Sequence, residues 1–353
     1  MLPTNYHSHT IIDCTIRDGG YYTNWLFEDD FLFAYLNLCD LLSIDYVDIG
    51  LRSLYAQSYR GKFAYSPTTL LHELFHAYPN LKFSVLINFS EASEWSANDL
   101  NRLFPVNDYK SLIRIAVKPN AYNETAPLIG FLTDRGYTIS LNIQNFPTTI
   151  EYYTHVIAYA KSINLSLLYL ADSRGSVLPS QVQDIVSYVA NSSLCPLGVH
   201  MHDNMSLAFA NTITAYNSGA TFLDSTFMGI GRGSGNCPTE YLCSFLKSLS
   251  PTILHQIQIF LDQFIVPLRQ THHWGSTLPY FISGKNMLPG SFLHSILQTR
   301  SYSLSSLFDI VDPAFPFSDS ILNPPSPVSS VLLERSNYLK VDFTSIIFGN
   351  GTG

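Results

Sequence analysis

The sequence is poor in charge, in paired cysteines and in long apolar runs. Charged residues make up 13% of the 353 positions, and the formal net charge is -8. No Lys/Arg cluster of the kind that neutralises phosphates stands out, so we expect no nucleic-acid partner. No apolar run reaches the roughly 18 residues that span a bilayer. Residues 1–10 lack the basic and apolar regions of a signal peptide. We therefore expect a cytoplasmic protein with no membrane partner.

The cysteines form no recognisable framework. There are five, an odd number, and no two of them make a CxxC pair. This pattern predicts neither a disulfide scaffold nor a thiolate zinc site. The cysteines are Cys14, Cys39, Cys195, Cys237 and Cys243.

Apolar residues, by contrast, make up 46% of the chain, which is ample for a large core. The low charge indicates surface buried against a second copy, so we expect a homo-oligomer, most simply a homodimer. The length exceeds that of a usual single domain, but (β/α)8 barrels of about 250 residues are common. One barrel over residues 1–250 with an extension over 251–353 is the economical division.

Strand-like apolar runs alternate with stretches of helical periodicity. The runs are Ile11–Cys14, Tyr46–Ile49, Phe83–Ile87, Leu112–Val117, Thr138–Ile143, Ser166–Leu170, Gly198–His202 and Thr221–Asp224. The helical stretches are Asp29–Leu42, Pro67–Tyr78, Ala97–Phe104, Ala121–Arg135, Pro147–Lys161, Pro179–Asn191, Met205–Ser218 and Pro238–Leu249. Such alternation predicts a parallel α/β fold with right-handed crossovers.

A TIM barrel fits this alternation better than an open, doubly wound sheet. An open sheet normally carries a glycine-rich phosphate loop after its first strand, and Gly19-Gly20, which we expect to form a turn, is not a GxGxxG motif. A barrel also brings the carboxyl ends of all its strands to one rim. The residues with chemical potential follow those ends, so the barrel makes them neighbours.

Two histidines stand out at the end of the seventh expected strand. Side chains alternate along a strand, so His200 and His202 project to the same side while Met201 faces away. Two neutral imidazoles and a carboxylate from the Arg17-Asp18 segment form a mixed oxygen and nitrogen set that suits Mn, Mg, Fe, Co or Zn. The alternative is a chance pairing on an exposed strand.

Beyond residue 250 the alternation stops. Leu254–Arg269 has a helical pattern, and a second helix-like segment covers Ser291–Thr299. Between them lies an aromatic stretch. We expect this part to be a mainly helical extension beside the barrel mouth. Residues 312–330 are rich in Pro and Ser and predict an irregular linker, and Leu339–Phe348 is compatible with one late strand.

The motifs resemble those of the DRE-TIM metallolyase superfamily, which includes 4-hydroxy-2-oxoacid aldolases, hydroxymethylglutaryl-CoA lyase, and the isopropylmalate and homocitrate synthases. The resemblance covers roughly residues 11–249. It rests on Asp13-x-Thr15-x-Arg17-Asp18-Gly19, Val47-Asp48-Ile49-Gly50, Ala171-Asp172-Ser173, His200-x-His202-Asp203-Asn204 and Gly229-Ile230-Gly231-Arg232-Gly233-Ser234-Gly235-Asn236.

That resemblance implies a divalent cation, Mn²⁺ or Mg²⁺ in the first instance and Co²⁺ or Zn²⁺ as alternatives. Its ligands would be Asp18, His200 and His202, with Asn236 as a fourth ligand or a supporting group. Arg17 would stabilise the enolate oxygen that forms when the carbon–carbon bond breaks, since a fixed guanidinium favours developing negative charge.

Two positions depart from the family pattern. The superfamily usually has Glu at the end of the second strand, where this chain has Asp48, which still could orient Arg17. In the aldolases a His acts in proton transfer at the position of Tyr21. A phenol is a poor base at neutral pH, so Tyr21 is a candidate proton donor. The base is left open among a metal-bound hydroxide and Tyr22, His272, His273 and His294.

Several residues at the same rim are candidates for holding an anionic substrate. Each has a plain structural alternative, such as a surface ion pair for an arginine or a tight turn for the glycine-rich segment around residue 232. The candidates are Arg52, Asn142, Ser173, Arg174 and Arg232.

We therefore predict a divalent-metal-dependent aldolase that makes or breaks a carbon–carbon bond of a 4-hydroxy-2-oxoacid through a pyruvate enolate. Its partner would be a small 2-oxoacid, and some enzymes of this superfamily also work with a partner enzyme. The alternatives are an acyl-CoA-dependent synthase or lyase, disfavoured because the synthases carry Gln where this chain has Gly20, and a degenerate barrel that only binds or assembles.

Overall fold

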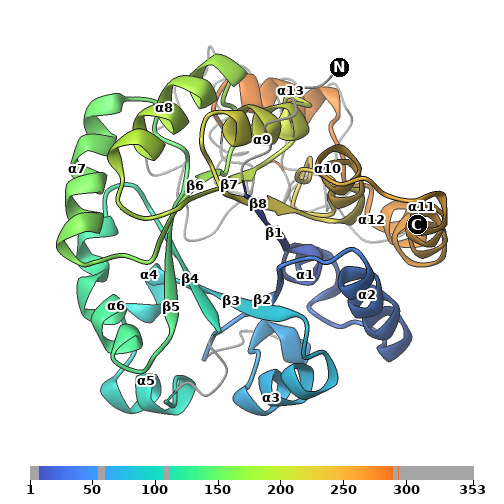
Figure 1. Ribbon diagram of the computed structural model, residues 1–353, viewed down its shortest axis with the longest axis horizontal. Helices are drawn as coiled ribbons and strands as arrows, with labels where there is room; N and C mark the ends of the chain where they lie inside the picture. Colours follow the sequence, from blue (N-terminus) through green and yellow to red (C-terminus); the bar gives the residue numbers. More distant parts are fainter. Residues whose placement is uncertain (1–7, 55–59, 107–110, 289–292, 294–353) are drawn as a thin grey trace, which may run out of the picture.

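The computed structural model describes residues 8–54, 60–106, 111–288 and 293, and its centre is a closed barrel of eight parallel strands (Figure 1). Each strand pairs with the next along the chain, and the last pairs with the first through Ile12 and Asp224. The strands are β1 Thr10–Asp13, β2 Tyr46–Leu51, β3 Lys82–Asn88, β4 Leu112–Val117, β5 Thr138–Ile143, β6 Leu167–Asp172, β7 Leu197–Met201 and β8 Phe222–Ser225. The predicted (β/α)8 fold is confirmed.

The strand sequences read as nearly continuous apolar runs because both faces are buried. Alternate residues of β1 divide between two cores. Ile11 joins the large outer core beneath the helices, and Ile12 joins a small inner cluster with Leu112, Leu167 and Tyr169. The barrel interior is therefore packed with side chains below its mouth, as in other barrels of this type.

Helices surround the barrel, and most cover the segments expected from periodicity (Figure 1). Those up to β8 are α1 Thr15–Thr23, α2 Asp29–Leu41, η1 Lys62–Ala64, α3 Thr68–Ala77, α4 Phe89–Ala92, α5 Ala97–Leu103, η2 Tyr122–Thr125, α6 Ala126–Thr133, α7 Ile150–Ser162, α8 Pro179–Ser192 and α9 Ala208–Asn217. Those after β8 are η3 Phe227–Gly229, α10 Thr239–Leu246, α11 Pro251–Phe260, the π-helical η4 Leu261–Ile265, α12 Val266–His272 and α13 Leu278–Lys285.

The expected turn at Gly19-Gly20 is wrong, because both glycines lie within α1, which begins directly after β1. A Cβ at Gly20 would lie 2.2 Å from the indole ring of Trp25. Glycine is therefore required here for close packing, not for chain reversal. The helix carries Arg17 and Asp18 to the carboxyl end of the barrel.

The described part of the extension is helical. Phe260 of α11 packs on Phe31 of α2, with ring centroids 5.8 Å apart. The helix α13 falls in the aromatic stretch that was not predicted to be helical, and it packs Gly284 against the backbone of Gly175. The expected segments 291–299, 312–330 and 339–348 lie outside the described residues, apart from buried Leu293. The domain division at residue 250 stays a prediction.

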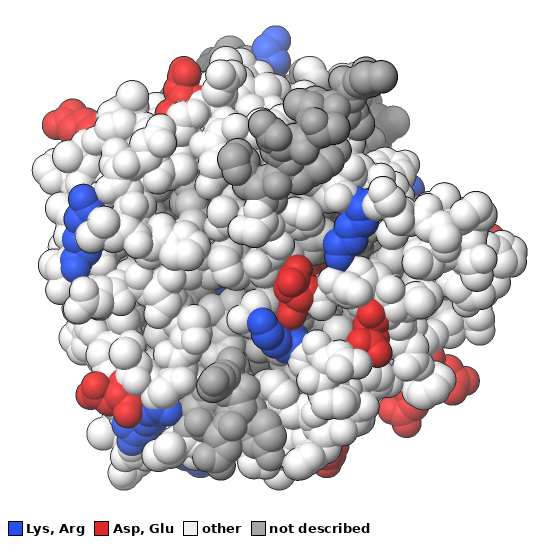
Figure 2. Space-filling model, viewed as in Figure 1, with Lys and Arg blue, Asp and Glu red and all other residues white. Residues whose placement is uncertain are grey.

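Charged side chains are sparse on the face that Figure 2 shows, and Lys and Arg are interspersed there with Asp and Glu. Within the described ranges, no helix combines the length and the apolar character that crossing a membrane requires.

Candidate active site

A pocket of about 500 Å³ opens at the carboxyl ends of the strands. It collects residues from the loops after most strands, which explains why positions far apart in the sequence meet here. The lining residues are Arg17, Asp18, Tyr21, Leu86, Asn88, Ala116, Lys118, Pro119, Asn120, Asn142, Gln144, Asn145, Ala171, Ser173, Arg174, His200, His202, Asn204, Arg232 and Gly233.

The three predicted metal ligands converge in this pocket. Nε2 of His200 lies 3.1 Å from Nε2 of His202 and 3.7 Å from Oδ2 of Asp18. The two imidazole rings meet edge to face, with centroids 5.0 Å apart. Alternation along β7 brings both rings to one side, as the sequence predicted.

The charge states favour a cation. Burial, followed by the nearby His200, lowers the pKa of His202 to about 3, so this imidazole is neutral and has a free lone pair. Burial raises the pKa of Asp18, but Arg17 and the two histidines outweigh it and lower the pKa overall. Neutral imidazoles and an ionised carboxylate are the states in which these groups bind metals.

Asn236 supports the same arrangement. Its Nδ2 donates to Oδ2 of Asp18 at 2.8 Å and to the carbonyl of Ile230 at 3.2 Å. Its Oδ1 is buried and has no hydrogen-bond partner in the described structure. An unsatisfied buried oxygen beside two imidazoles and a carboxylate fits a bound cation.

The glycine-rich segment lets Asn236 approach. A Cβ at Gly231 would lie 2.5 Å from Nδ2 of Asn236, and one at Gly235 would lie 2.1 Å from the carbonyl oxygen of Gly229. Gly235 also has a φ of +85°, which other residues rarely adopt. The glycines therefore serve a tight turn that packs against the candidate ligands.

A second group of candidate donors lies deeper in the barrel. The ligand atoms of Cys14, His200 and Asp224 all lie within 4.8 Å of one another. Its carboxylate is already paired, because Oδ2 of Asp224 lies 2.5 Å from Nη2 of Arg114. Burial raises the pKa of the Cys14 thiol well above its ordinary value. A protonated thiol, and a carboxylate already paired with Arg114, make this group a poorer candidate for a cation than Asp18, His200 and His202.

Arg17 lines the pocket and is 6% exposed. Its guanidinium lies 3.2 Å from Asp18, 3.4 Å from Asp48 and 3.9 Å from Asp224, measured between the nearest nitrogen and oxygen atoms. These carboxylates fix Arg17 beside the candidate ligands. Asp48 is fully buried below Arg17 and does not line the pocket, so its position is that of a residue that orients Arg17.

Arg114 and Asp224 also belong to this site, although neither was predicted from the sequence to take part in it. Arg114 is fully buried, pairs with Asp48 at 2.8 Å and Asp224 at 2.5 Å, and stacks on the ring of Tyr169. Arg114 stands alone as a charge inside the apolar run Leu112–Val117, which is a signal that could have identified it. Asp224 accepts from Tyr169 at 2.7 Å and contacts His200 at 2.8 Å.

Tyr21 lines the pocket, and the guanidinium carbon of Arg232 lies 4.2 Å from the centre of its ring. The other candidates for the base lie elsewhere. Tyr22 donates to the carbonyl of Gly231 at 3.1 Å, and burial raises its pKa. Neither His272 nor His273 is among the described residues that line the pocket, and His294 is outside the described residues.

Four of the five predicted substrate-binding residues line the pocket, namely Asn142, Ser173, Arg174 and Arg232. Ser173 and Arg174 follow β6, and Arg232 is exposed in the glycine-rich segment.

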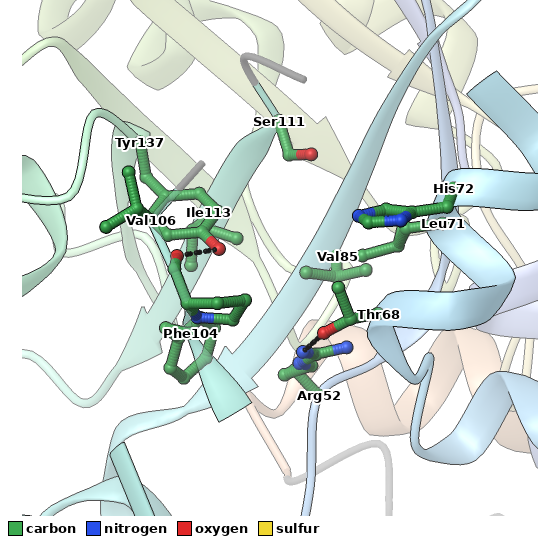
Figure 3. Close-up of a pocket in the computed structure, with 11 residues that line it drawn as sticks. Arg52, Thr68, Leu71, His72, Val85, Phe104, Val106, Ser111, Ile113 and Tyr137 are labelled. Atoms are coloured by element: carbon green, nitrogen blue, oxygen red, sulfur yellow. Dashed lines mark hydrogen bonds between the residues drawn. The ribbon is translucent and has the colours of Figure 1, made fainter. Parts of the chain in front are cut away.

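The expectation that Arg52 reaches the same rim is wrong. Its guanidinium points into a separate small cavity between the strands and α3, where it donates to Thr68 Oγ1 (Figure 3). It also donates to the carbonyls of Ser66 and Leu103. The pairing of β2 with β3 shifts register between Asp48 and Leu51, just before Arg52, and such irregularities commonly re-aim the side chains that follow. Burial lowers the pKa of Arg52 to about 10.

The chain is similar to known proteins over much of its length. Residues 117–263 match the family model described as HMGL-like. The chain is 27% identical to oxaloacetate decarboxylase from Mycobacterium tuberculosis (strain ATCC 25618 / H37Rv), over 70% of this chain and 73% of that protein. It is 23% identical to 4-hydroxy-2-oxovalerate aldolase from Moorella thermoacetica, over 83% and 87% respectively.

Among solved structures, the N-terminal domain of a proposed aldolase from Bacteroides vulgatus superposes with a TM-score of 0.74 at 30% identity. The match covers 85% of this chain and 99% of that domain. The chain therefore belongs to the HMGL-like family, which is the DRE-TIM group that its motifs resemble. It is a carbon–carbon lyase, and the alternative of a binding or assembly module is set aside.

Proposed function

We propose that this enzyme is a divalent-metal-dependent aldolase that makes or breaks the C3–C4 bond of a 4-hydroxy-2-oxoacid through a pyruvate enolate. The observation that carries the proposal is the convergence of Asp18, His200 and His202 beside a buried, fixed Arg17. The reactions named for the two relatives above share a pyruvate enolate, since loss of carbon dioxide from oxaloacetate and retro-aldol cleavage both produce one.

The proposed roles follow from position. Asp18, His200 and His202 would hold the cation, with Asn236 as a further ligand or supporting group. A divalent cation there supplies positive charge that polarises the 2-oxo carbonyl. Arg17 faces the same space and would stabilise the enolate oxygen, an effect typically worth about 3 to 4 kcal/mol for one preorganised donor.

Tyr21 would carry the proton. In the direction of bond formation, its phenol donates a proton to the aldehyde oxygen as that oxygen gains charge and is left as a phenolate. In cleavage this phenolate takes the proton of the C4 hydroxyl and returns to the phenol. Arg232 packs on the ring of Tyr21 and would hold it in the pocket. Together with Arg174, Asn142 and Ser173, Arg232 would also bind the anionic substrate.

The proposal includes Mn²⁺ or Mg²⁺ as the cation, with Co²⁺ or Zn²⁺ as alternatives, and a cytoplasmic homodimer. The low overall charge supports burial of surface between copies.

Pyruvate enolisation tests the proposal directly. Purified enzyme is depleted of metal, reloaded with Mn²⁺ or Mg²⁺ and incubated with pyruvate in D₂O, and loss of the methyl signal is followed by NMR. We expect one equivalent of cation per chain and metal-dependent exchange. Arg17→Lys should slow the exchange by about 100-fold or more while metal binding is retained.

Asp18→Asn, in contrast, should weaken metal binding and exchange together. An enzyme that takes up no stoichiometric cation and exchanges no pyruvate protons would contradict the proposal. Activity that requires acetyl-CoA would instead favour the acyl-CoA-dependent alternative.

A further inference from the structure

The side of the pocket away from the candidate ligands is lined by carboxamide side chains. They come from neighbouring strands and the loops that follow β3, β4 and β5. They are Asn88, Asn120, Asn142, Gln144 and Asn145. Because β3, β4 and β5 are adjacent in the barrel, these amides form one continuous wall.

These amides have unused hydrogen-bonding capacity. Asn142 is only 4% exposed, and its Oδ1 accepts from Oγ of Ser140, which turns Nδ2 away from that bond. In the described part of the chain, Nδ2 of Asn142 and the amide groups of Asn88 and Gln144 make no hydrogen bond with protein. A buried amide with a free donor is costly unless water or a ligand satisfies it.

Asn204, on the β7 side of the pocket, is a second amide with an unused donor. It is 3% exposed, and Oγ of Ser234 donates to its Oδ1 at 2.6 Å, which fixes the orientation of the amide. Its Nδ2 is buried without a partner among the described residues. The pocket thus has one buried, unpartnered amide donor on the β7 side, opposite the half-exposed amides of Asn88 and Gln144.

The chemistry of the wall indicates what it recognises. A carboxamide offers one acceptor and two donors, which matches a hydroxyl group that both donates and accepts. The apolar lining consists of Leu86, Ala116, Pro119 and Ala171, mostly small side chains. An aldehyde with only a methyl or ethyl group would leave the amides without partners.

We propose that the aldehyde half of the substrate carries hydroxyl groups, so that the substrate is a polyhydroxylated 4-hydroxy-2-oxoacid. This inference rests on the proposed function. The bond forms between C3 of the pyruvate enolate and the carbonyl carbon of the aldehyde, and the aldehyde oxygen takes up one proton. No oxidant or reductant is needed. The amide wall binds the hydroxyls beyond the new bond.

The aldehyde preference tests this. We compare D-glyceraldehyde with propanal, which has the same three-carbon skeleton without the additional hydroxyls, in the metal-loaded enzyme with saturating pyruvate. We expect kcat/KM to be about 25-fold higher for D-glyceraldehyde, which corresponds to two hydrogen bonds that contribute about fivefold each.

Variants separate this preference from the greater intrinsic reactivity of glyceraldehyde. Asn142→Leu and Asn88→Leu should each lower the ratio of the two kcat/KM values by about fivefold. Asn217→Leu changes an exposed residue at the end of α9 and should leave the ratio unaltered. A ratio that stays the same in the two wall variants would overturn the inference.

A binding measurement asks the same question without turnover. The Mg²⁺-loaded enzyme is titrated with D-gluconate and with hexanoate, two six-carbon monoacids that differ in their hydroxyl groups. We expect gluconate to bind at least tenfold more tightly, and equal affinities would overturn the inference. Preference for gluconate together with absent pyruvate exchange would overturn the proposed aldolase activity and uphold the hydroxyl-binding wall.

Discussion

Nδ1 of His200 lies 2.8 Å from Oδ2 of Asp224, in the interior of the barrel below the pocket. Asp224 is held in turn by Arg114 at 2.5 Å and by the hydroxyl of Tyr169 at 2.7 Å. Burial raises the pKa of Asp224, but Arg114, His200 and Arg17 together outweigh it and lower the pKa overall. An ionised Asp224 accepts a hydrogen bond from the Nδ1–H of His200, which fixes the tautomer in which Nε2 presents its lone pair to the pocket.

Replacing this carboxylate should weaken the cation site. We expect Asp224→Asn to raise the Kd for Mn²⁺ by about 10- to 100-fold, because His200 loses the partner that fixes its tautomer. Isothermal titration calorimetry measures the change. Asp184→Asn alters an exposed carboxylate on α8 and serves as the control. An unchanged Kd in Asp224→Asn would show that this pair does not orient the ligand.

Removing the Tyr21 hydroxyl should slow the aldol step more than enolisation. Tyr21→Phe keeps the ring beneath Arg232 and removes only the proton donor. We expect kcat for bond formation to fall by about 100-fold or more, a common value for loss of a general acid. Pyruvate proton exchange should fall much less, and the ratio of the two rates is the readout. Equal losses in both would assign Tyr21 to binding instead.

Glu240 should make stability depend on pH. Burial is the main reason that its pKa rises to about 7, although its side chain accepts the Met228 N–H at 3.0 Å. The folded protein binds this proton more tightly than the unfolded chain, so the contribution to stability is full below about pH 4.5 and is lost as the pH rises through 7.

We therefore expect Glu240→Gln to be more stable than the parent at pH 8, by about 2 kcal/mol, and to gain little at pH 5. Urea unfolding at both pH values measures this. Glu151→Gln, an exposed change on α7, should show no such difference. A Glu240→Gln gain that is the same at both pH values would contradict the assignment.

Substitution of Arg52 should affect stability, whereas substitution of Arg232 should affect substrate binding. Arg52→Met removes the donors to the Ser66 and Leu103 carbonyls and should lower the free energy of unfolding by about 1 to 3 kcal/mol, with KM unchanged. Arg232→Met should raise KM for the 2-oxoacid and leave stability within about 0.5 kcal/mol, because Arg232 is exposed. A higher KM with unchanged stability in Arg52→Met would show instead that Arg52 binds substrate.

The local sequence pattern was sufficient to predict the strands and the common orientation of the two histidines. Leu112–Val117 has the same bounds in the sequence-based prediction and in the structure, because a strand buried on both faces must be apolar throughout. The alternation that brings His200 and His202 to one side is equally local. Periodicity alone places Asp18 only in a charged segment after the first strand. The motif resemblance identified it as a candidate metal ligand.

Other features depend on contacts that no local pattern contains. Gly19-Gly20 reads as a turn but lies within α1, where Gly19 packs against Ile230, which is distant in the sequence. Arg52 follows a strand that does end at the rim, yet its side chain, just after an irregularity in the strand pairing, points to the outside. In both cases the neighbour that decides the outcome was not evident from the local sequence.

The sequence by itself determined the alternation of strands and helices, and with it the barrel and the common rim, because hydrophobic periodicity reports burial residue by residue. The tertiary structure decided how charge is compensated inside that barrel. Arg114 on β4, Asp48 on β2 and Asp224 on β8 become partners only when the sheet closes. These three strands are not consecutive along the chain, so only the closed fold sets the distances between their side chains.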